Sequence, residues 1–180
     1  MEVDYFFDNS VLLLKPHKFH DERGFFSEIY SSKELEKIGI DTKFVQENFS
    51  LSKSKNVFRG LHFQKTPHEQ AKLIRVLYGS ILDIVVDLRK DSNSFLSHKT
   101  FKLSKDNFTQ IYIPKGFAHG FLTLSSKTEI SYKTSDFYYP ELERSISWED
   151  KSLKIKLPVK KTDLIISDKD KSALTVDEVI

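Results

Sequence analysis

No cysteine occurs in this chain of 180 residues, which excludes disulfide bonds and thiolate chemistry. Glycine (6) and proline (5) are scarce, so no flexible linker is predicted to divide the chain. No long apolar run follows the N-terminal Met1-Glu2-Val3-Asp4, and therefore neither a signal peptide nor a membrane span is predicted. These absences predict a single domain over residues 1–180 and a cytoplasmic location.

An excess of charge of one sign is also lacking. The 28 lysine and arginine residues are mixed with 26 acidic residues, and the net charge is only +2. No basic stripe therefore marks a surface for nucleic acid or membrane. An anionic small molecule remains a possible ligand, because it needs only a few well-placed cations.

The chain is rich in aromatic residues, with 15 phenylalanines and 7 tyrosines. These residues favour sheet over helix, so a mainly β fold is expected. One short surface helix is predicted over residues 31–39, where Ser31 provides the N-cap, acidic residues follow and Gly39 ends the pattern.

From Lys72 onward, apolar residues alternate with polar ones or form continuous β-branched runs. The turn residues Gly79-Ser80 predict that the first two runs pair as a hairpin. Turn signals between the runs have the spacing of a β-sandwich or barrel. Among these an antiparallel jelly-roll barrel with a few short peripheral helices is the expected architecture, and the interior of such a barrel can hold a ligand. The predicted strands are residues 73–77, 81–88, 99–103, 110–113, 120–124 and 129–134.

Several polar side chains interrupt these apolar segments. His62 follows Arg59-Gly60-Leu61, and Lys72, His119 and Tyr132 also fall within strand-like runs. Burying such groups is unfavourable unless they are paired, so each position needs an explanation. From the residues alone, an edge strand explains His62 as well as a functional role does, and a solvated face is the simpler explanation for Lys72.

The main alternatives in chemistry can be compared with these residues. A metal-binding jelly roll uses a His-x-His pair, which this chain lacks, and His17 and His20 have no matching partners nearby. There is no Gly-x-Ser-x-Gly nucleophile motif, phosphate-binding loop or dinucleotide fingerprint. Proton transfer is the chemistry that remains.

Seven ordered segments between about residue 10 and residue 172 resemble the dTDP-4-dehydrorhamnose 3,5-epimerase family. The resemblance implies a cupin-type jelly-roll subunit, a nucleotide-sugar substrate, no metal and no cofactor. It also implies a homodimer that shares strands across its interface. The segments are residues 21–28, 44–50, 59–64, 72–76, 83–89, 113–121 and 167–170.

The resemblance implies an epimerase that inverts C3 and C5, the carbons flanking the C4 ketone of dTDP-4-dehydro-6-deoxyglucose. His62 is similar to the family's general base, and Asp170, chosen over Asp168, to the carboxylate that pairs with it. Lys72 resembles the group that stabilises the enolate oxygen. Tyr132 resembles the acid that returns a proton from the opposite face, although from the residues alone core packing explains it better.

The other matches resemble substrate-binding positions. Arg59 and Arg23 would neutralise the diphosphate, and Tyr138 would stack on thymine. In that family the segment carrying Arg23, Glu28, Gln46 and Asn48 can come from the neighbouring subunit. The remaining matches to the pocket are His119, Glu143 and Lys169.

Three other interpretations stay open at this stage. One is an epimerase that inverts only one of the two carbons, and another is an enzyme for a different nucleotide-linked 4-keto-sugar. The third is a non-catalytic sugar-nucleotide binder. Glu47 and Phe49 stand where the family commonly has Asp and His, which bears on fine substrate preference rather than on the reaction.

Overall fold

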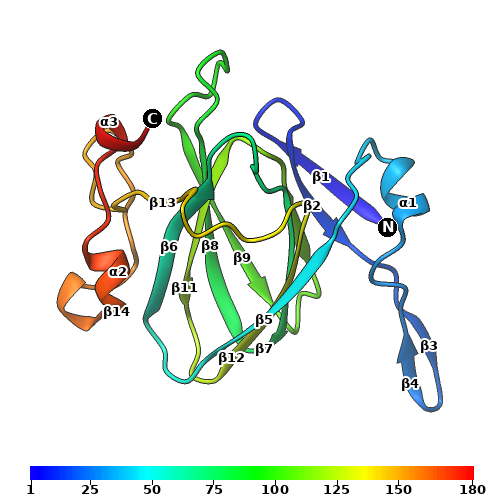
Figure 1. The fold of residues 1–180 in the computed structure, drawn as a ribbon. Helices are drawn as coiled ribbons and strands as arrows, with labels where there is room; N and C mark the ends of the chain where they lie inside the picture. Colours follow the sequence, from blue (N-terminus) through cyan, green and yellow to red (C-terminus); the bar gives the residue numbers. More distant parts are fainter.

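The computed structural model describes residues 1–180 as two antiparallel sheets packed face to face, in a jelly-roll arrangement (Figure 1). The first sheet has the order β1 (Glu2–Phe6), β2 (Val11–Lys15), β10 (Gln110–Ile113), β7 (Lys72–Tyr78), β12 (Thr128–Thr134) and β5 (Gln46–Ser52). The second has the order β13 (Glu143–Ser145), β6 (Val57–Gln64), β11 (Phe117–Thr123), β8 (Ser80–Asp87) and β9 (His98–Ser104). The short strand β14 (Ile165–Ile166) runs parallel to β6.

The main core lies between the two sheets. Alternate residues of the strands point inward, as in Ile74 and Val76 of β7 and Ile81 and Val85 of β8, and all four side chains are buried. Because successive side chains of a strand point to opposite faces, the aromatic and β-branched residues at alternate positions pack together between the two sheets. The predicted mainly β, jelly-roll fold is therefore confirmed.

Each sheet also has a covered outer face. The segment around α1 (Ser32–Glu36) buries Leu35 and Ile40 against the first sheet. The C-terminal segment covers the second sheet with residues such as Val176 and Val179 of α3 (Val176–Val179). That segment also contains a 3-10 turn (Lys161–Asp163) and α2 (Asp168–Lys171).

The predicted hairpin at Gly79-Ser80 is wrong. β7 pairs with β10 and β12, whereas β8 pairs with β9 and β11 in the other sheet. Only Gly79 separates the two strands, so no two-residue turn is formed and the chain crosses between sheets. Gly79 has a φ of +78°, and a Cβ there would lie 2.5 Å from Ser125 Oγ, so glycine is required at this corner.

Other local expectations are confirmed. Ser31 caps the predicted helix by accepting from the Glu34 backbone, and the predicted strands from residue 73 onward are present within a few residues. No strand bounds were predicted before residue 72, although β1, β2, β5 and β6 lie there. No helix in the structure is long and apolar enough to cross a membrane.

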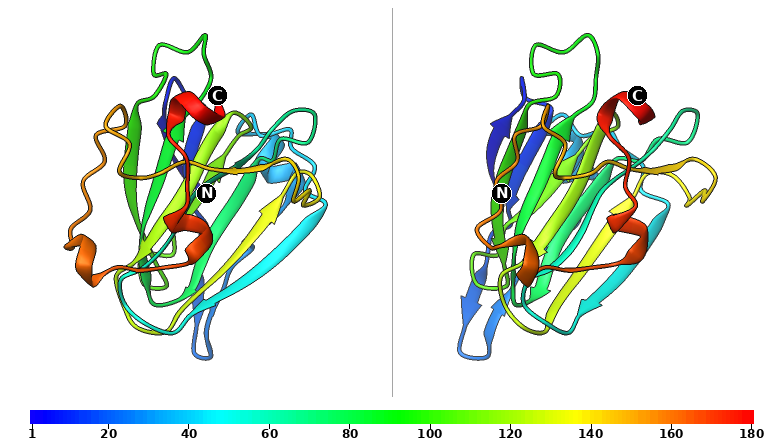
Figure 2. Two further views of the ribbon diagram at one scale, coloured as in Figure 1. Left: turned by 60° about the vertical axis from the view of Figure 1, so that its left-hand side comes forward. Right: turned by 90° about the vertical axis from the view of Figure 1, so that its left-hand side faces the viewer.

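A two-stranded arm extends away from the sandwich (Figures 1 and 2). It consists of β3 (Phe19–Asp21) and β4 (Gly24–Phe26), which pair only with each other. Phe19, Phe25 and Phe26 on this arm are 57%, 49% and 71% exposed. Three large aromatic side chains therefore stand open to solvent on one short hairpin.

Candidate active site

A cleft of about 900 Å³ opens between the two sheets. β5, β7 and β12 of the first sheet form one wall, and β6 and β11 of the second sheet form the other. The segment before β13 and the helix α2 complete its rim. The cleft thus lies where polar residues interrupt the apolar strands.

An irregularity in β6 aims two side chains into this cleft. His62 pairs with His119, but Arg59 pairs with Phe121, so β6 has one residue more than β11 between these pairs. This bulge places Arg59 and His62 on the same face although they are three residues apart. Glycine is needed in the bulge because Gly60 has a φ of +133°, and a Cβ there would lie 2.5 Å from the Gly120 Cα.

His62 forms a pair with a buried carboxylate. Its Nε2 lies 2.6 Å from Asp170 Oδ1, and the side chains of His62 and Asp170 are 30% and 4% exposed. Burial opposes ionisation of Asp170, but hydrogen bonds from His62, the Gly60 backbone and Ser167 outweigh it and lower its pKa. The pair therefore holds a negative charge behind the imidazole while the ring remains accessible from the cleft.

Lys72 and Tyr132 face the cleft from the first sheet. Burial lowers the pKa of Lys72 to about 8, although the charges of Glu143 and Asp83 favour its protonated form. Burial, reinforced by the charge of Glu143, raises the pKa of Tyr132, against the opposing effect of Arg59. At neutral pH the cleft therefore contains a desolvated ammonium group and a protonated phenol.

A second histidine–carboxylate pair lies deeper in the second sheet. His119 Nε2 is 2.7 Å from Asp83 Oδ2, and the two side chains are 11% and 0% exposed. The other carboxylate oxygen, Asp83 Oδ1, is buried without a hydrogen-bond partner. His119 is thus fixed by a residue that does not itself line the cleft.

The rim of the cleft carries a further set of polar contacts. Tyr138 donates its hydroxyl to Glu143 Oε2 at 2.7 Å, and Lys169 forms an ion pair with the same carboxylate. Burial disfavours ionised Glu143, but the bonds from Lys169 and Tyr138 outweigh it and lower the pKa of Glu143. The bond to Glu143 raises the pKa of Tyr138 to about 12. No group of three or more His, Asp or Glu side chains is arranged to hold a metal ion.

These groups are suited to proton transfer. An imidazole with a carboxylate partner lies on the wall formed by the second sheet, and an ammonium and a phenol lie on the wall formed by the first. A base, a cation for a developing oxyanion and a proton donor are thus all present around one cleft.

Known proteins are similar to this chain in both sequence and structure. The family model described as dTDP-4-dehydrorhamnose 3,5-epimerase matches residues 9–178. The chain belongs to this family. The epimerase of that name from Escherichia coli (strain K12) is 47% identical over 171 residues, which cover 94% of this chain and 91% of that protein.

Solved structures of family members superimpose closely on this chain. The Bacillus anthracis str. Ames epimerase, with TDP and PPi bound, has a TM-score of 0.93 and 44% identity and covers 97% of this chain and 99% of its own. The Legionella pneumophila Philadelphia 1 member, in complex with dTDP-4-keto-L-rhamnose, has a TM-score of 0.92 and 39% identity. It covers 99% of this chain and 94% of its own.

All but two of the predicted epimerase site residues line the cleft. The expected pairing of Asp170 with His62 is present, whereas Asp168 is exposed and contacts Lys171. Lys72 lies in the cleft and not on a solvated face. The cleft-lining members of the predicted set are Gln46, Asn48, Arg59, His62, Lys72, His119, Tyr132, Tyr138, Glu143, Lys169 and Asp170.

The two exceptions are Arg23 and Glu28, which do not line this cleft. Arg23 lies at the turn of the exposed arm and forms an ion pair with Asp21. Gln46 and Asn48, which the resemblance also assigns to a segment that can come from a neighbouring subunit, line the cleft of their own chain. Both lie on β5, which pairs with β12 and places them in the cleft of their own chain.

Two residues around the epimerase site were missed from the sequence. Asp83 supports His119, and the signal for it was a carboxylate within the apolar run of residues 81–86. Gln64 is 4% exposed and bonds to the segment that carries Tyr138. Its signal was weaker, because a glutamine at the end of a strand is common on protein surfaces.

Proposed function

We infer that this chain is an isomerase that inverts C3 and C5 of dTDP-4-dehydro-6-deoxyglucose to give dTDP-4-dehydrorhamnose. The observation that carries this inference is the His62–Asp170 pair, which faces a cleft shared with Lys72 and Tyr132 in a member of the epimerase family. The C4 ketone acidifies the protons on C3 and C5, so the reaction needs only removal of a proton and its return to the other face.

In this proposal His62 removes the proton. Asp170 occupies Nε2, which leaves Nδ1 as the ring nitrogen free to accept a proton from the substrate. The ionised, buried carboxylate then stabilises the imidazolium that forms. The electrons of the broken C–H bond move to the C4 oxygen and form an enolate.

Lys72 stabilises that enolate, and Tyr132 completes the inversion. A pKa of about 8 leaves Lys72 protonated at neutral pH, in a desolvated position where its charge acts strongly. The raised pKa of Tyr132 keeps its proton available for the carbon. Because Tyr132 belongs to the first sheet and His62 to the second, the proton returns from the face opposite to its removal.

The remaining cleft residues bind the nucleotide part. Arg59 supplies a permanent positive charge for the diphosphate. Gln46 and Asn48 hydrogen-bond to each other and offer amide groups to the thymidine, and Tyr138 provides an aromatic face for the base. His119, Glu143 and Lys169 complete the polar lining. Relatives bound to TDP or to dTDP-4-keto-L-rhamnose support this assignment.

The reaction is tested by incubating the protein with dTDP-4-dehydro-6-deoxyglucose in deuterated water. NMR is expected to show one deuteron gained at C3 and one at C5, together with the inverted configuration at both carbons. Exchange at one carbon alone would indicate a single-centre epimerase. Binding of dTDP without exchange at either carbon would disprove the inference and leave a non-catalytic binder.

We propose that the active protein is a homodimer in which the arm of one subunit completes the site of the other. The arm exposes three phenylalanines and carries Arg23 at its turn, and neither Arg23 nor Glu28, which follows the arm, lines the cleft of its own chain. A surface of this kind is typical of a protein interface. Arg23 would then reach the diphosphate bound by the partner subunit.

This dimer predicts complementation between two variants that are each impaired at substrate concentrations well below KM. Arg23→Ala is expected to weaken dTDP binding by about 10- to 100-fold, the range for a lost hydrogen bond between charged groups. In a mixed dimer of Arg23→Ala with His62→Asn, one of the two sites has both residues intact. Co-expression should therefore restore about a quarter of the wild-type activity, given random pairing. If Arg23 acted within its own chain, no mixed dimer would have an intact site.

A further inference from the structure

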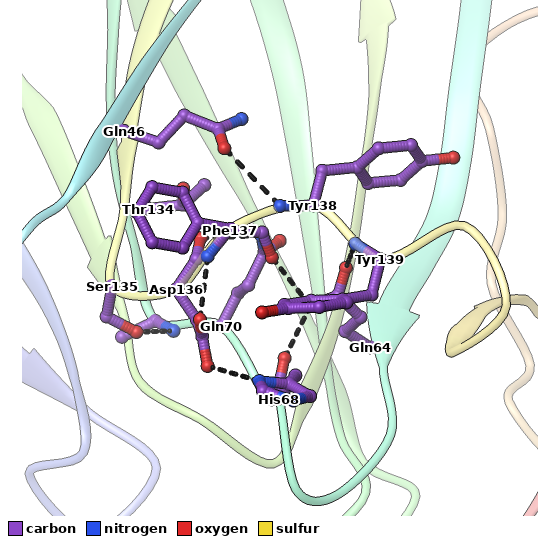
Figure 3. Close-up of polar contacts among 11 residues, drawn as sticks. Gln46, Gln64, His68, Gln70, Thr134, Ser135, Asp136, Phe137, Tyr138 and Tyr139 are labelled. Carbon is purple, nitrogen blue, oxygen red and sulfur yellow. Dashed lines mark hydrogen bonds and ion pairs between the residues drawn. The ribbon is translucent and has the colours of Figure 1, made fainter.

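The segment between β12 and β13 carries Tyr138 at the rim of the cleft. Residues 135–139 form neither helix nor strand, yet side chains from elsewhere bond to their backbone groups (Figure 3). Backbone groups of an irregular segment otherwise depend on water. The position of this segment is therefore set by the side chains that hold it.

Gln64 makes the central contacts in this arrangement. Its Nε2 donates to the Phe137 carbonyl oxygen at 3.1 Å, and its Oε1 accepts from the Tyr139 backbone N–H at 2.8 Å. The same Nε2 donates to the His68 carbonyl oxygen. The two bonds to the segment thus hold the residues on either side of Tyr138, and both ends of the Gln64 amide are used.

Neighbouring side chains bond to the same segment. Gln70 Nε2 donates to the carbonyl oxygens of Asp136 at 2.9 Å and Phe137 at 3.0 Å. The imidazole of His68 lies 3.0 Å from Asp136 Oδ2 and stacks on Tyr139, with ring centroids 3.9 Å apart. Gln64 differs from Gln70 and His68 in being almost fully buried, so water cannot replace its bonds.

We propose that Gln64 is a positioning residue that holds Tyr138 in place for stacking on the nucleotide base. The proposal rests on the function inferred above. Gln64 is two residues from His62 on β6, so one strand links the base-binding rim to the site of proton removal. A glutamine is required because the position needs donors toward two carbonyl groups and an acceptor toward an N–H group.

The test measures dTDP binding by calorimetry, which does not depend on turnover. Gln64→Met keeps an unbranched side chain of similar length but removes these hydrogen bonds. It is expected to raise the Kd for dTDP and the KM by about tenfold while kcat stays within about threefold, because the proton-transfer residues are untouched. Gln70→Met is the matched control, since Phe137 keeps its bond to Gln64 and Asp136 keeps its bond to Thr134.

A double-mutant cycle shows whether Gln64 acts through Tyr138. If it does, Gln64→Met has no further effect on the Kd in a Tyr138→Ala background. A loss as large in that background as in wild type would overturn the proposal, as would an equal loss for Gln70→Met. If Gln64→Met does not fold, Gln64→Asn provides the same cycle, because its amide is too short to make all the bonds. Failure of the wild type to exchange deuterium would overturn the inferred reaction. The dTDP binding measurements would still show whether Gln64 positions Tyr138, because they do not depend on turnover.

Discussion

Replacing His62 with asparagine is expected to lower kcat for epimerisation by about 10²- to 10⁴-fold, the usual contribution of a general base. Asparagine retains a polar side chain near Asp170 but cannot accept a proton at neutral pH. Deuterium incorporation at both C3 and C5 should fall together, because one imidazole serves both carbons in the proposed mechanism. The Kd for dTDP is expected to change by less than about threefold, since the nucleotide is held by other residues.

His98→Asn is the matched control for this substitution. His98 begins β9, on the far side of the second sheet from β6, and does not line the cleft. Its replacement should leave kcat and exchange unchanged. If His62→Asn lost exchange at only one carbon, a different base would act at the other. If exchange continued at both carbons at the wild-type rate, His62 would not be the base.

Replacing Lys72 with methionine is expected to inactivate the protein and at the same time stabilise it. Loss of the cation that is proposed to hold the enolate should lower kcat by about 10²- to 10³-fold. The pKa of Lys72 falls from 10.5 to about 8 on folding, which corresponds to about 3 kcal/mol of destabilisation while the group is charged. Urea denaturation at pH 7 should therefore give a larger free energy of unfolding for Lys72→Met than for wild type, by on the order of 2–3 kcal/mol.

The pH dependence of the stability difference distinguishes the removal of a desolvated charge from a gain in hydrophobic packing by the methionine. Between about pH 8 and pH 10.5 the unfolded chain binds a proton at Lys72 that the folded chain has lost. The stability of the wild type relative to Lys72→Met should therefore rise across this range, and kcat of the wild type should fall above about pH 8. Lys102→Met, at an exposed position of β9, is the control and should change neither quantity. A stability difference that is the same at pH 7 and pH 10 would contradict a desolvated Lys72.

Sequence patterns were sufficient for the class of fold, whereas most of the predicted cleft residues came from the resemblance to the epimerase family. Alternation of apolar residues reports on local strand formation, and the cleft residues lie in motifs that keep their order along the chain. The pairing of β7 with β8 could not be read in this way. Gly79-Ser80 has the residues of a tight turn, but whether two strands pair or separate into different sheets depends on contacts distant in sequence.

The bulge in β6 shows a second limit. Strict alternation puts Arg59 and His62 on opposite faces of a strand, yet both line the cleft because β6 has an extra residue opposite β11. The role of Asp83 could not be predicted from the sequence for a related reason. Its partner, His119, lies on a neighbouring strand, and only the pairing of β8 with β11 brings the two together.

Because His62 and Tyr132, the proposed base and acid, lie on opposite sheets, the spacing between the sheets determines how closely both side chains can approach the substrate. That spacing is set by side chains such as Ile74, Ile130 and Phe121, which pack between the sheets next to the cleft. The volume of the hydrophobic core therefore sets the distance between the groups that are proposed to exchange protons with the substrate. Substitutions that thin or thicken this layer are expected to alter the turnover rate without touching any group that exchanges a proton.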